Sequence, residues 1–381
     1  MKETRNIRAC SRARAVGFFL ALAAAVGFSG CQPKSLIPDA YAGMSVSSTS
    51  EVPDSTVPHP LPPTSSKEEN APPAAVLYKD FLTGLSTADA GAKSARPVSI
   101  VIDNKDPLLM QSGTADAAIW VEAPIEDGST RIMLLYSGVK GIPTVASVAS
   151  TRSYLVELSS AFGAIAVYAG TTDTIGEASI PYNGYDTLDY ILQNLSSVFY
   201  RDTTVASPYS LLTDGIRITN GILNCRYDST RKEGQTLPFF LTEANLPTSG
   251  TSAKTLYLNF SSTQITAFSL GSDGLYYRAQ NGALHTDAAG TEIAFKSLLL
   301  LSCDSILYEQ QNQTKLDFDL QKGGGGYAVF DGVATPILWK LEADGSLTVQ
   351  NEAGGKLTLP AGKTYIGLLK SSNTSSILFT E

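Results

Sequence analysis

The stretch AAIWVEAPIEDGSTRIMLLYSG, Ala117–Gly138, organises the amino-terminal half of the chain. Two apolar runs, Ala117–Val121 and Ile132–Tyr136, flank a polar hinge, and this pattern predicts two strands joined by a turn. Charged side chains that abut two apolar strands indicate either a buried ion pair or a binding site. The polar residues of the hinge and its borders are Glu122, Glu126, Asp127, Thr130 and Arg131.

Two strands and a helix are predicted around this hairpin. Val98–Ile102 and Ala164–Tyr168 are short apolar runs, typical of buried strands. A helix is expected to begin after Ser150 or Thr151, either of which can cap its first turn, and Gly163 suits its end. The apolar face of this helix has four residues at helical spacing: Tyr154, Leu155, Leu158 and Phe162.

Two more helices are predicted before residue 232. One covers Thr187–Phe199 with Asp186 as its cap, and a weaker pattern covers Tyr209–Leu223. Strands that alternate with helices indicate a mixed α/β layer. We therefore expect a mixed α/β domain over residues 93–232.

Short β runs replace this pattern after Pro238. They are separated by Asp-Gly, Asn-Gly and Gly-Gly pairs, which favour tight hairpins. Ile293–Ser302 is the most apolar of these runs. Gly323–Gly326 lies between two predicted strands and is expected to be a mobile loop. It is not a phosphate loop, because no Gly-Lys-Ser/Thr ending follows it. The predicted fold class is therefore α+β: the mixed α/β amino-terminal domain is followed by a mostly antiparallel β carboxyl-terminal domain over residues 240–372.

Composition and charge limit the range of partners. The chain has 381 residues, of which 43% are hydrophobic, enough for about two domains with cores of their own. Its formal net charge is −8, and without the five basic and one acidic side chains of residues 1–30 it carries 23 basic and 35 acidic side chains, a net charge of −12. Such a chain repels phosphate backbones, so we expect no nucleic-acid partner.

Residues 1–30 have the layout of a secretory signal peptide. A basic region ends at Arg14, and the uncharged apolar run Ala15–Phe28 is shorter than the roughly 20 residues of a membrane span. Small residues directly before Cys31 resemble a bacterial lipobox. That resemblance implies cleavage before Cys31, lipidation of its thiol, and anchoring on the extracytoplasmic face of the cell membrane. An ordinary signal peptide and an uncleaved anchor are the alternatives.

Residues 31–76 are expected to form a disordered tether. Gln32–Ala75 holds nine of the 19 prolines and has almost no apolar periodicity. Such a segment cannot bury enough apolar surface to offset the entropy lost on ordering. The folded part is therefore expected to be a head on a flexible tether.

Cys225 and Cys303 are the cysteines that remain after the signal peptide and Cys31. In an oxidising compartment they can pair as a disulfide. Two separate buried thiols are the slightly favoured alternative, because the sequence cannot place the two Cα atoms within bridging distance.

Short fragments between residues 96 and 369 occur in a characteristic order. On the amino side they are Arg96-Pro97, Ile102-Asp103-Asn104, Gln111-Ser112-Gly113, Ala115-Asp116, Val121-Glu122, Gly128, Thr130-Arg131, Ser150 and Arg152. On the carboxyl side they are Tyr277-Arg278, Gly282, His285, Asp287, Gly290, Phe330-Asp331-Gly332, Trp339-Lys340, Pro360 and Gly362-Lys363-Thr364. In this order they resemble the YerB-like lipoproteins, a bacterial family of uncharacterised function. The resemblance implies an extracytoplasmic lipoprotein with two consecutive domains, and it supplies no established reaction.

Two positions depart from the family pattern. Similar proteins often carry a histidine where Tyr168 stands, and a His-Asn pair where Tyr209-Ser210 stands. Chemistry that depended on those histidines would be lost or changed in this chain. His285 is the histidine that remains in the folded part, and it is expected to make a structural hydrogen bond.

Five polar residues are the candidates for function. Arg131 and Arg152 can each clamp a carboxylate or phosphate through two hydrogen bonds, and Ser150 accompanies Arg152 in the resembling pattern. The alternative is a buried Arg–Glu pair that holds the hairpin to the helix. Glu122 and Glu126 could act on a sugar as paired carboxylates, or they could be hinge acids with one ion pair.

The leading hypothesis is a non-enzymatic protein of the cell envelope. Its head would bind a cell-wall polymer, a peptide or an envelope protein through Glu122, Glu126, Arg131, Ser150 and Arg152. We expect no cofactor and no metal, because histidine and cysteine are few and the acidic residues form no calcium loop. The alternatives are a carbohydrate- or peptidoglycan-acting hydrolase that uses the paired carboxylates, and a purely structural assembly protein.

Overall fold

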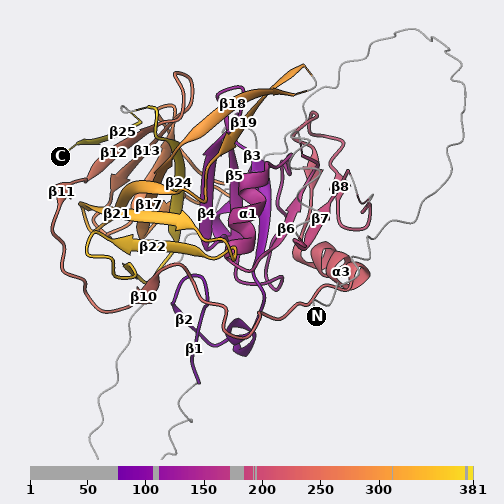
Figure 1. Ribbon diagram of the computed structural model, residues 1–381. Coiled ribbons are helices and arrows are strands. Elements are labelled where there is room, and N and C mark those ends of the chain that lie inside the picture. The colour runs from indigo at the N-terminus through magenta and orange to yellow at the C-terminus, as the bar shows by residue number, and fades with distance from the viewer. Residues whose placement is uncertain are drawn as a thin grey trace, which may run out of the picture. The chain divides into compact units, whose positions relative to one another are not determined.

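A central sheet of 11 strands runs through the folded part of the computed structural model (Figure 1). The structure describes residues 76–105, 111–171, 184–191, 193, 195–310, 312–373 and 376–380, so the predicted signal peptide, Cys31 and almost all of the tether lie outside it. In spatial order the strands are β11 (Thr251–Ser252), β21 (Val333–Leu341), β20 (Gly324–Phe330), β17 (Ser297–Cys303), β24 (Thr364–Lys370), β4 (Ile119–Pro124), β5 (Thr130–Tyr136), β3 (Val98–Asp103), β6 (Ile165–Tyr168) and β7 (Thr187–Asp189), with β22 (Leu347–Asn351) beside β21.

The two halves of the chain meet inside this sheet. Strand β24 of the carboxyl-terminal half lies parallel to β4 of the amino-terminal half, with Thr364 opposite Ile119 and Ile366 opposite Val121. The segments 93–232 and 240–372, expected as two domains, therefore share one hydrogen-bonded sheet. Independent folding of either segment stays a prediction.

A second, six-stranded sheet is antiparallel and belongs to the carboxyl-terminal half. Its side chains pack with those of β4, β5 and β24 in one apolar cluster, which contains Trp120, Leu256, Phe268 and Tyr365. The strands are β15 (Ala283–Leu284), β14 (Tyr276–Gln280), β13 (Ile265–Leu270), β12 (Thr255–Asn259) and β25 (Ile377–Thr380), with β16 (Ala294–Phe295) beside β14.

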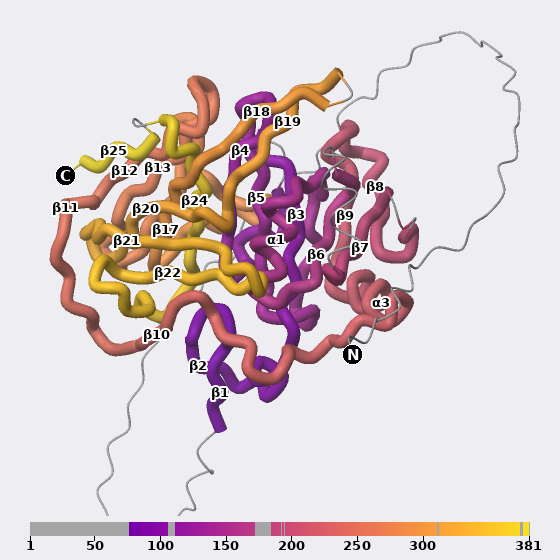
Figure 2. Tube along the Cα trace, in the orientation of Figure 1, coloured from indigo at the N-terminus to yellow at the C-terminus, as the bar shows by residue number. Residues whose placement is uncertain are grey.

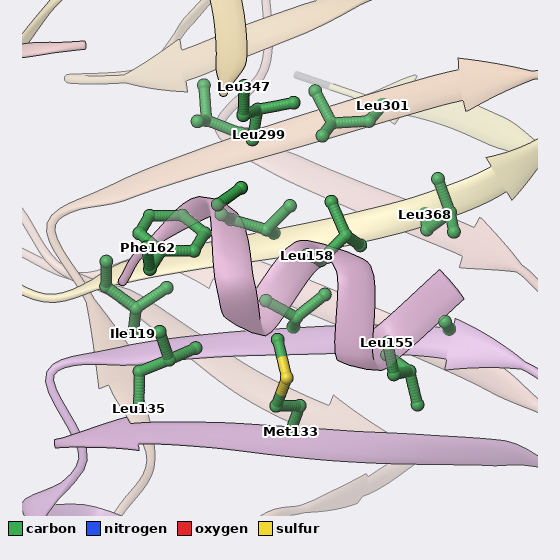
Figure 3. Close-up of a cluster of buried hydrophobic side chains, with 14 of the residues drawn as sticks. Ile119, Met133, Leu135, Leu155, Leu158, Phe162, Leu299, Leu301, Leu347 and Leu368 are labelled. Carbon is green, nitrogen blue, oxygen red and sulfur yellow. The ribbon is translucent and has the colours of Figure 1, made fainter. Parts of the chain in front are cut away.

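The opposite face of the central sheet is covered by helix α1 (Ser153–Ala161). Figure 3 shows Leu155, Leu158 and Phe162 lying among side chains of β4, β5, β17 and β24. Side chains alternate between the two faces of a strand, so β4 sends Ile119 to this core and its neighbour Trp120 to the other. The predicted hairpin and the predicted face of this helix are confirmed.

Several short elements surround the two sheets. Figure 2 shows that the chain between α3 and β10 passes beside β1 and β2. These elements are β1 (Tyr78–Lys79), β2 (Ser86–Thr87), β8 (Tyr200–Arg201), β9 (Leu211–Leu212), α3 (Gly215–Cys225), β10 (Phe240–Thr242), β18 (Ser305–Gln310), β19 (Gln313–Phe318), β23 (Thr358–Pro360) and the 3-10 turns η1 (Ala90–Lys93) and η2 (Thr114–Asp116).

The fold is mostly β, with two α-helices in the described residues, fewer than the sequence predicts. The predicted helix over Thr187–Phe199 is wrong at its start, where β7 pairs in parallel with β6. The Asp189 carboxylate accepts hydrogen bonds from Gly170 N and Ile191 N, both at 2.8 Å, and closes a turn there. Sheet pairing and this turn satisfy backbone groups that a helix would have used.

The boundaries of the other two helices also differ from expectation. The cap position of α1 is Arg152, in extended conformation, and no side chain caps this helix, whereas Ser150 or Thr151 was expected. Helix α3 begins at Gly215 because the Asp214 side chain accepts a hydrogen bond from Arg217 N at 2.8 Å. The Tyr209–Leu223 prediction is therefore correct only from Gly215 onward.

The expected loop at Gly323–Gly326 is wrong, since Gly324 to Gly326 open strand β20. A Cβ atom at Gly326 would lie 2.0 Å from Leu300 O, and one at Gly324 would lie 2.1 Å from Ser302 O. Glycine is needed here because the backbone of β17 approaches too closely for a side chain. The glycine run therefore supports a close strand contact.

Candidate functional site

Glu122 lies in the middle of β4 with its side chain completely buried. It points to the same face as Trp120, two residues earlier, toward the second sheet. A buried carboxylate must be paired or hydrogen-bonded to remain charged. Two residues of the amino-terminal half donate to its Oε1 atom: Asn104 Nδ2 at 3.0 Å and Thr130 Oγ1 at 2.9 Å.

Three residues of the carboxyl-terminal half complete the surroundings of Glu122. Arg278 of β14, equally buried, places Nη2 2.9 Å from Glu122 Oε2. Thr266 Oγ1 donates from β13 at 3.1 Å, and Tyr365 OH donates from β24 at 2.8 Å. Burial and the Glu122 charge raise the pKa of Tyr365 well above its usual value, so this hydroxyl stays a donor. The carboxylate therefore ties the two halves together.

Arg278 extends this network to three further groups. Its Nη2 also donates a hydrogen bond to Gln280 Oε1 at 3.0 Å. Gln280 Nε2 in turn donates to Asn104 O, a backbone carbonyl of the amino-terminal half, at 2.9 Å. Its Nη1 hydrogen-bonds His285 Nδ1. Arginine has no acceptor atom, so His285 must accept through Nδ1 and carry its proton on Nε2.

His285 is a neutral, buried hydrogen-bond acceptor. Its side chain is 2% exposed, and its ring meets Trp120 edge-on with centroids 5.6 Å apart. Burial and the positive charge of Arg278 lower the pKa of His285 from 6.5 to about 2. The predicted structural hydrogen bond is confirmed, and the ring is too deeply buried to exchange protons with a surface ligand.

A second charged cluster lies where the β4–β5 hairpin meets α1. Arg152 forms a two-point ion pair with Glu126, with Nε–Oε1 at 2.6 Å and Nη2–Oε2 at 2.5 Å. Arg131 pairs with Asp103 at 3.0 Å. Both arginines also contact Ser150: Arg131 Nε reaches its carbonyl at 3.2 Å, and Arg152 Nη1 reaches its hydroxyl at 3.5 Å.

Burial and charge oppose each other in this second cluster. Burial disfavours the charged form of Glu126, but the hydrogen bond and charge of Arg152 outweigh it and lower the pKa of Glu126. The pKa of Arg131 is lowered by burial and by the neighbouring Arg152, while Asp103 acts in the opposite direction. The side chains of Arg131, Arg152 and Glu126 remain 11%, 3% and 14% exposed, so solvent reaches this cluster only at its edge.

The structure brings together four of the five predicted site residues: Glu126, Arg131, Ser150 and Arg152. Glu122 is not among them, because it faces the second sheet while α1 and its cap Arg152 lie on the opposite face of β4. Glu122 and Glu126 therefore do not line a common cleft. The paired-carboxylate arrangement is wrong for these residues, since each carboxylate is held by a different arginine.

The described part of the chain contains neither a metal-ligand cluster nor a disulfide. No group of three or more His, Cys, Asp or Glu side chains there could hold a metal ion. Cys225 and Cys303 are both thiols, so the alternative of a disulfide between them is wrong. They pack against different apolar clusters, and burial raises the pKa of Cys303 to about 12.

The sequence did not assign Arg278, Thr266, Gln280 or Tyr365 to the surroundings of Glu122. For Arg278 the sequence holds one signal, since it belongs to a fragment shared with the resembling family, and the structure places it in a strand whose side chains alternate between buried and half-buried. An arginine at a core-facing position implies a buried partner. Nothing in the sequence identifies that partner as Glu122.

Two family models match the chain, and together they cover more than half of it. They are the amino-terminal domain of a protein of unknown function, DUF3048, over residues 82–228, and the carboxyl-terminal domain of the same family over residues 256–366. The chain belongs to this family, and the resemblance to the YerB-like proteins is confirmed.

A relative and a solved structure agree with this assignment. The chain is 26% identical over 337 residues to YerB of Bacillus subtilis strain 168, described as a candidate lipoprotein, and the match covers 82% of this chain and 92% of that protein. The crystal structure of YerB from Bacillus subtilis has the same fold, with a TM-score of 0.68 at 23% identity over 80% of this chain and 100% of that one. Among the described residues, no helix is long and apolar enough to cross a membrane.

The buried ion pair leads to a test of stability. Glu122→Ala leaves the Arg278 charge buried without its partner, which typically costs about 3–5 kcal/mol. We expect urea unfolding to show a loss of this size. Glu243→Ala, which removes the exposed ion pair to Lys79 at 2.7 Å, is the matched control and should change stability little. Equal effects of the two substitutions would contradict the role of Glu122.

His285 leads to a prediction about pH. The unfolded chain binds a proton on this histidine below about pH 6.5, whereas the folded chain does so only near pH 2. Its contribution to stability is therefore complete above pH 6.5 and is lost as the pH falls, by at most about 1.4 kcal/mol per pH unit.

His285→Gln keeps an acceptor for Arg278 and removes this titration. Between pH 7 and pH 4.5, urea unfolding should show that the wild-type protein loses about 2–3 kcal/mol more than the variant. A loss of the same size in both proteins would show that His285 is protonated in the folded state.

Proposed function

We propose that this chain is a lipid-anchored protein of the extracytoplasmic face of the cell membrane, which binds an envelope ligand or partner without catalysing a reaction. The observation that carries the proposal is that Glu122 and Glu126, the two carboxylates of the alternative hydrolase hypothesis, are both held by arginines, and Glu122 lies in the core. A carboxylate that must act as acid, base or nucleophile has to reach its substrate. Glu122 cannot do so without disrupting the contact between the two halves.

Membrane anchoring is supported by the sequence and by a relative. Cys31 follows an apolar run and small residues, and a Pro-, Ser- and Thr-rich segment separates it from the head. YerB is itself described as a candidate lipoprotein. The acyl chains on Cys31 would hold the head at the membrane, within reach of cell-wall polymers and envelope proteins.

The cluster of Glu126, Arg131, Ser150 and Arg152 is our candidate for one ligand contact. Glu126 occupies the fork of Arg152 in the way that a ligand carboxylate would, and it is the most exposed of the three charged side chains. A rotation of Glu126 toward solvent would open this fork. In the absence of ligand, the same pair holds the hairpin to α1.

Anchoring is tested at Cys31. In a bacterium with a lipoprotein pathway, the protein should incorporate a radiolabelled fatty acid, and Cys31→Ser should abolish this labelling. Cys10→Ser removes a cysteine of the signal peptide and should leave the labelling unchanged. Full labelling of Cys31→Ser would exclude lipidation at this residue.

Binding without catalysis is tested with soluble peptidoglycan fragments. We expect the immobilised protein to retain fragments, and mass spectrometry to show no new masses after incubation. Arg152→Ala should abolish retention, while Arg217→Ala, a change at a partly exposed arginine of α3, should not. New fragment masses that disappear with Glu126→Gln would instead support the hydrolase.

A further inference from the structure

A groove of ≈ 590 Å³ lies at the edge of the head, away from both charged clusters. Four parts of the chain form it: the β1 hairpin with Phe81, Lys93 at the end of η1, the chain from Arg231 to Leu241, and Lys356 just before β23. Its volume is within the range of small-molecule sites. Most of these residues lie outside the two family matches, which cover residues 82–228 and 256–366. The groove is therefore built largely from segments that the family models do not match.

The floor of the groove is apolar and aromatic. Phe239 and Leu237 are buried, whereas Phe240 is 55% exposed although it is a large apolar side chain. An exposed aromatic residue inside a concave apolar site is characteristic of ligand pockets. The apolar lining consists of Phe81, Leu237, Phe239, Phe240 and Leu241.

The charged residues of the lining are mostly cationic. Lys79 is neutralised by Glu243 at 2.7 Å, but Lys93, Arg231 and Lys356 form no ion pair with any described residue. Asp80 is the acid of the lining, and its Oδ1 accepts from Thr83 N and Thr83 Oγ1, both at 2.8 Å, within its own turn. The lining therefore carries three cations without an ion-pair partner, and Asp80 is the carboxylate of the lining whose charge acts on Arg231.

Two of these cations lie over aromatic rings of the floor. The Arg231 guanidinium is 3.9 Å from the ring centre of Phe81, and the Lys356 ammonium is 4.6 Å from that of Phe240. Arg231 Nη2 donates to Lys93 O at 2.8 Å, while its buried Nη1 has no acceptor among the described residues. Burial lowers the pKa of both Arg231 and Lys356, and the charge of Asp80 only partly offsets this effect at Arg231. A bound anion would supply the missing acceptor and offset this desolvation.

We propose that this groove binds an anionic amphiphile, with its phosphate or carboxylate on Arg231 and Lys356 and its apolar chain along the aromatic floor. The two cations attract the anionic head of the ligand, and the surface of Phe81 and Phe240 contacts its apolar chain. This inference rests on the proposed role as a binding protein and adds a second site with a defined ligand class. An intact membrane surface is a different occupant, because a concave groove accepts a single molecule.

The test uses dodecyl phosphate below its critical micelle concentration as the probe. Calorimetric titration of the full chain carrying Cys31→Ser, which avoids detergent, should show saturable binding. Inorganic phosphate and dodecanol, which each carry half of the ligand chemistry, should bind at least tenfold more weakly. Saturable binding of inorganic phosphate alone, or no binding of dodecyl phosphate, would overturn the proposal.

Matched substitutions inside and outside the groove test whether dodecyl phosphate binds there. Lys356→Gln and Arg231→Gln should each weaken dodecyl phosphate binding about tenfold, the usual effect of losing one charge-assisted hydrogen bond. Lys254→Gln, at an exposed lysine outside the groove, should not change it. Since Arg231 also packs on Phe81, Lys356→Gln is the decisive variant if Arg231→Gln unfolds. Equal affinities of Lys356→Gln and Lys254→Gln would overturn the proposal.

Two further measurements separate this proposal from its alternatives. Binding to phosphatidylglycerol vesicles without binding to monomeric dodecyl phosphate would assign the groove to a membrane surface and overturn the amphiphile. Retention of peptidoglycan fragments should be unaffected by Lys356→Gln, because it depends on the Arg152 cluster. A negative result for dodecyl phosphate therefore does not change the expected retention of peptidoglycan fragments, so each proposal can be overturned independently of the other.

Discussion

The ion pair between Glu122 and Arg278 is the interaction on which the architecture depends. Moving two charges out of water costs several kcal/mol each, and a single contact at 2.9 Å does not offset that cost. The remaining stabilisation comes from neutral donors of both halves: Asn104, Thr266 and Tyr365 all reach the carboxylate. Because these donors come from different sheets, the carboxylate is satisfied only when both halves are assembled in one register.

This requirement explains why the two halves share a sheet. Pairing of β24 with β4 places Tyr365 opposite Trp120 and Gly367 opposite Glu122. A slip by one residue would send Glu122 to the α1 side, where its neighbours Val121 and Ala123 pack in an apolar core. Buried polar groups of this kind favour one arrangement over others, in addition to any stability that they contribute.

Local sequence patterns predicted the elements that depend on the spacing of their own apolar residues. The hairpin and α1 follow from strand alternation and from Leu155, Leu158 and Phe162 at helical spacing. Thr187–Phe199 shows the same helical spacing, yet Leu188 is buried through parallel pairing of β7 with β6. The partner of Glu122 could not be predicted, since Arg278 lies 156 residues away and either residue alone is compatible with a surface pair.

The charges that stand out in the sequence differ from those that the fold leaves without an ion-pair partner. Charged residues beside apolar strands are conspicuous in a sequence, but their position makes it easy for the fold to pair them, as it does for Glu122, Glu126, Arg131 and Arg152. Arg231 and Lys356 lie in segments without periodicity, and these cations have no carboxylate within ion-pair distance in the described structure. A cation without an ion-pair partner can still form a charge-assisted hydrogen bond with an anionic ligand. The exposed aromatic floor beside it can contact the apolar part of that ligand. The groove therefore offers a ligand two cations without an ion-pair partner beside an apolar floor.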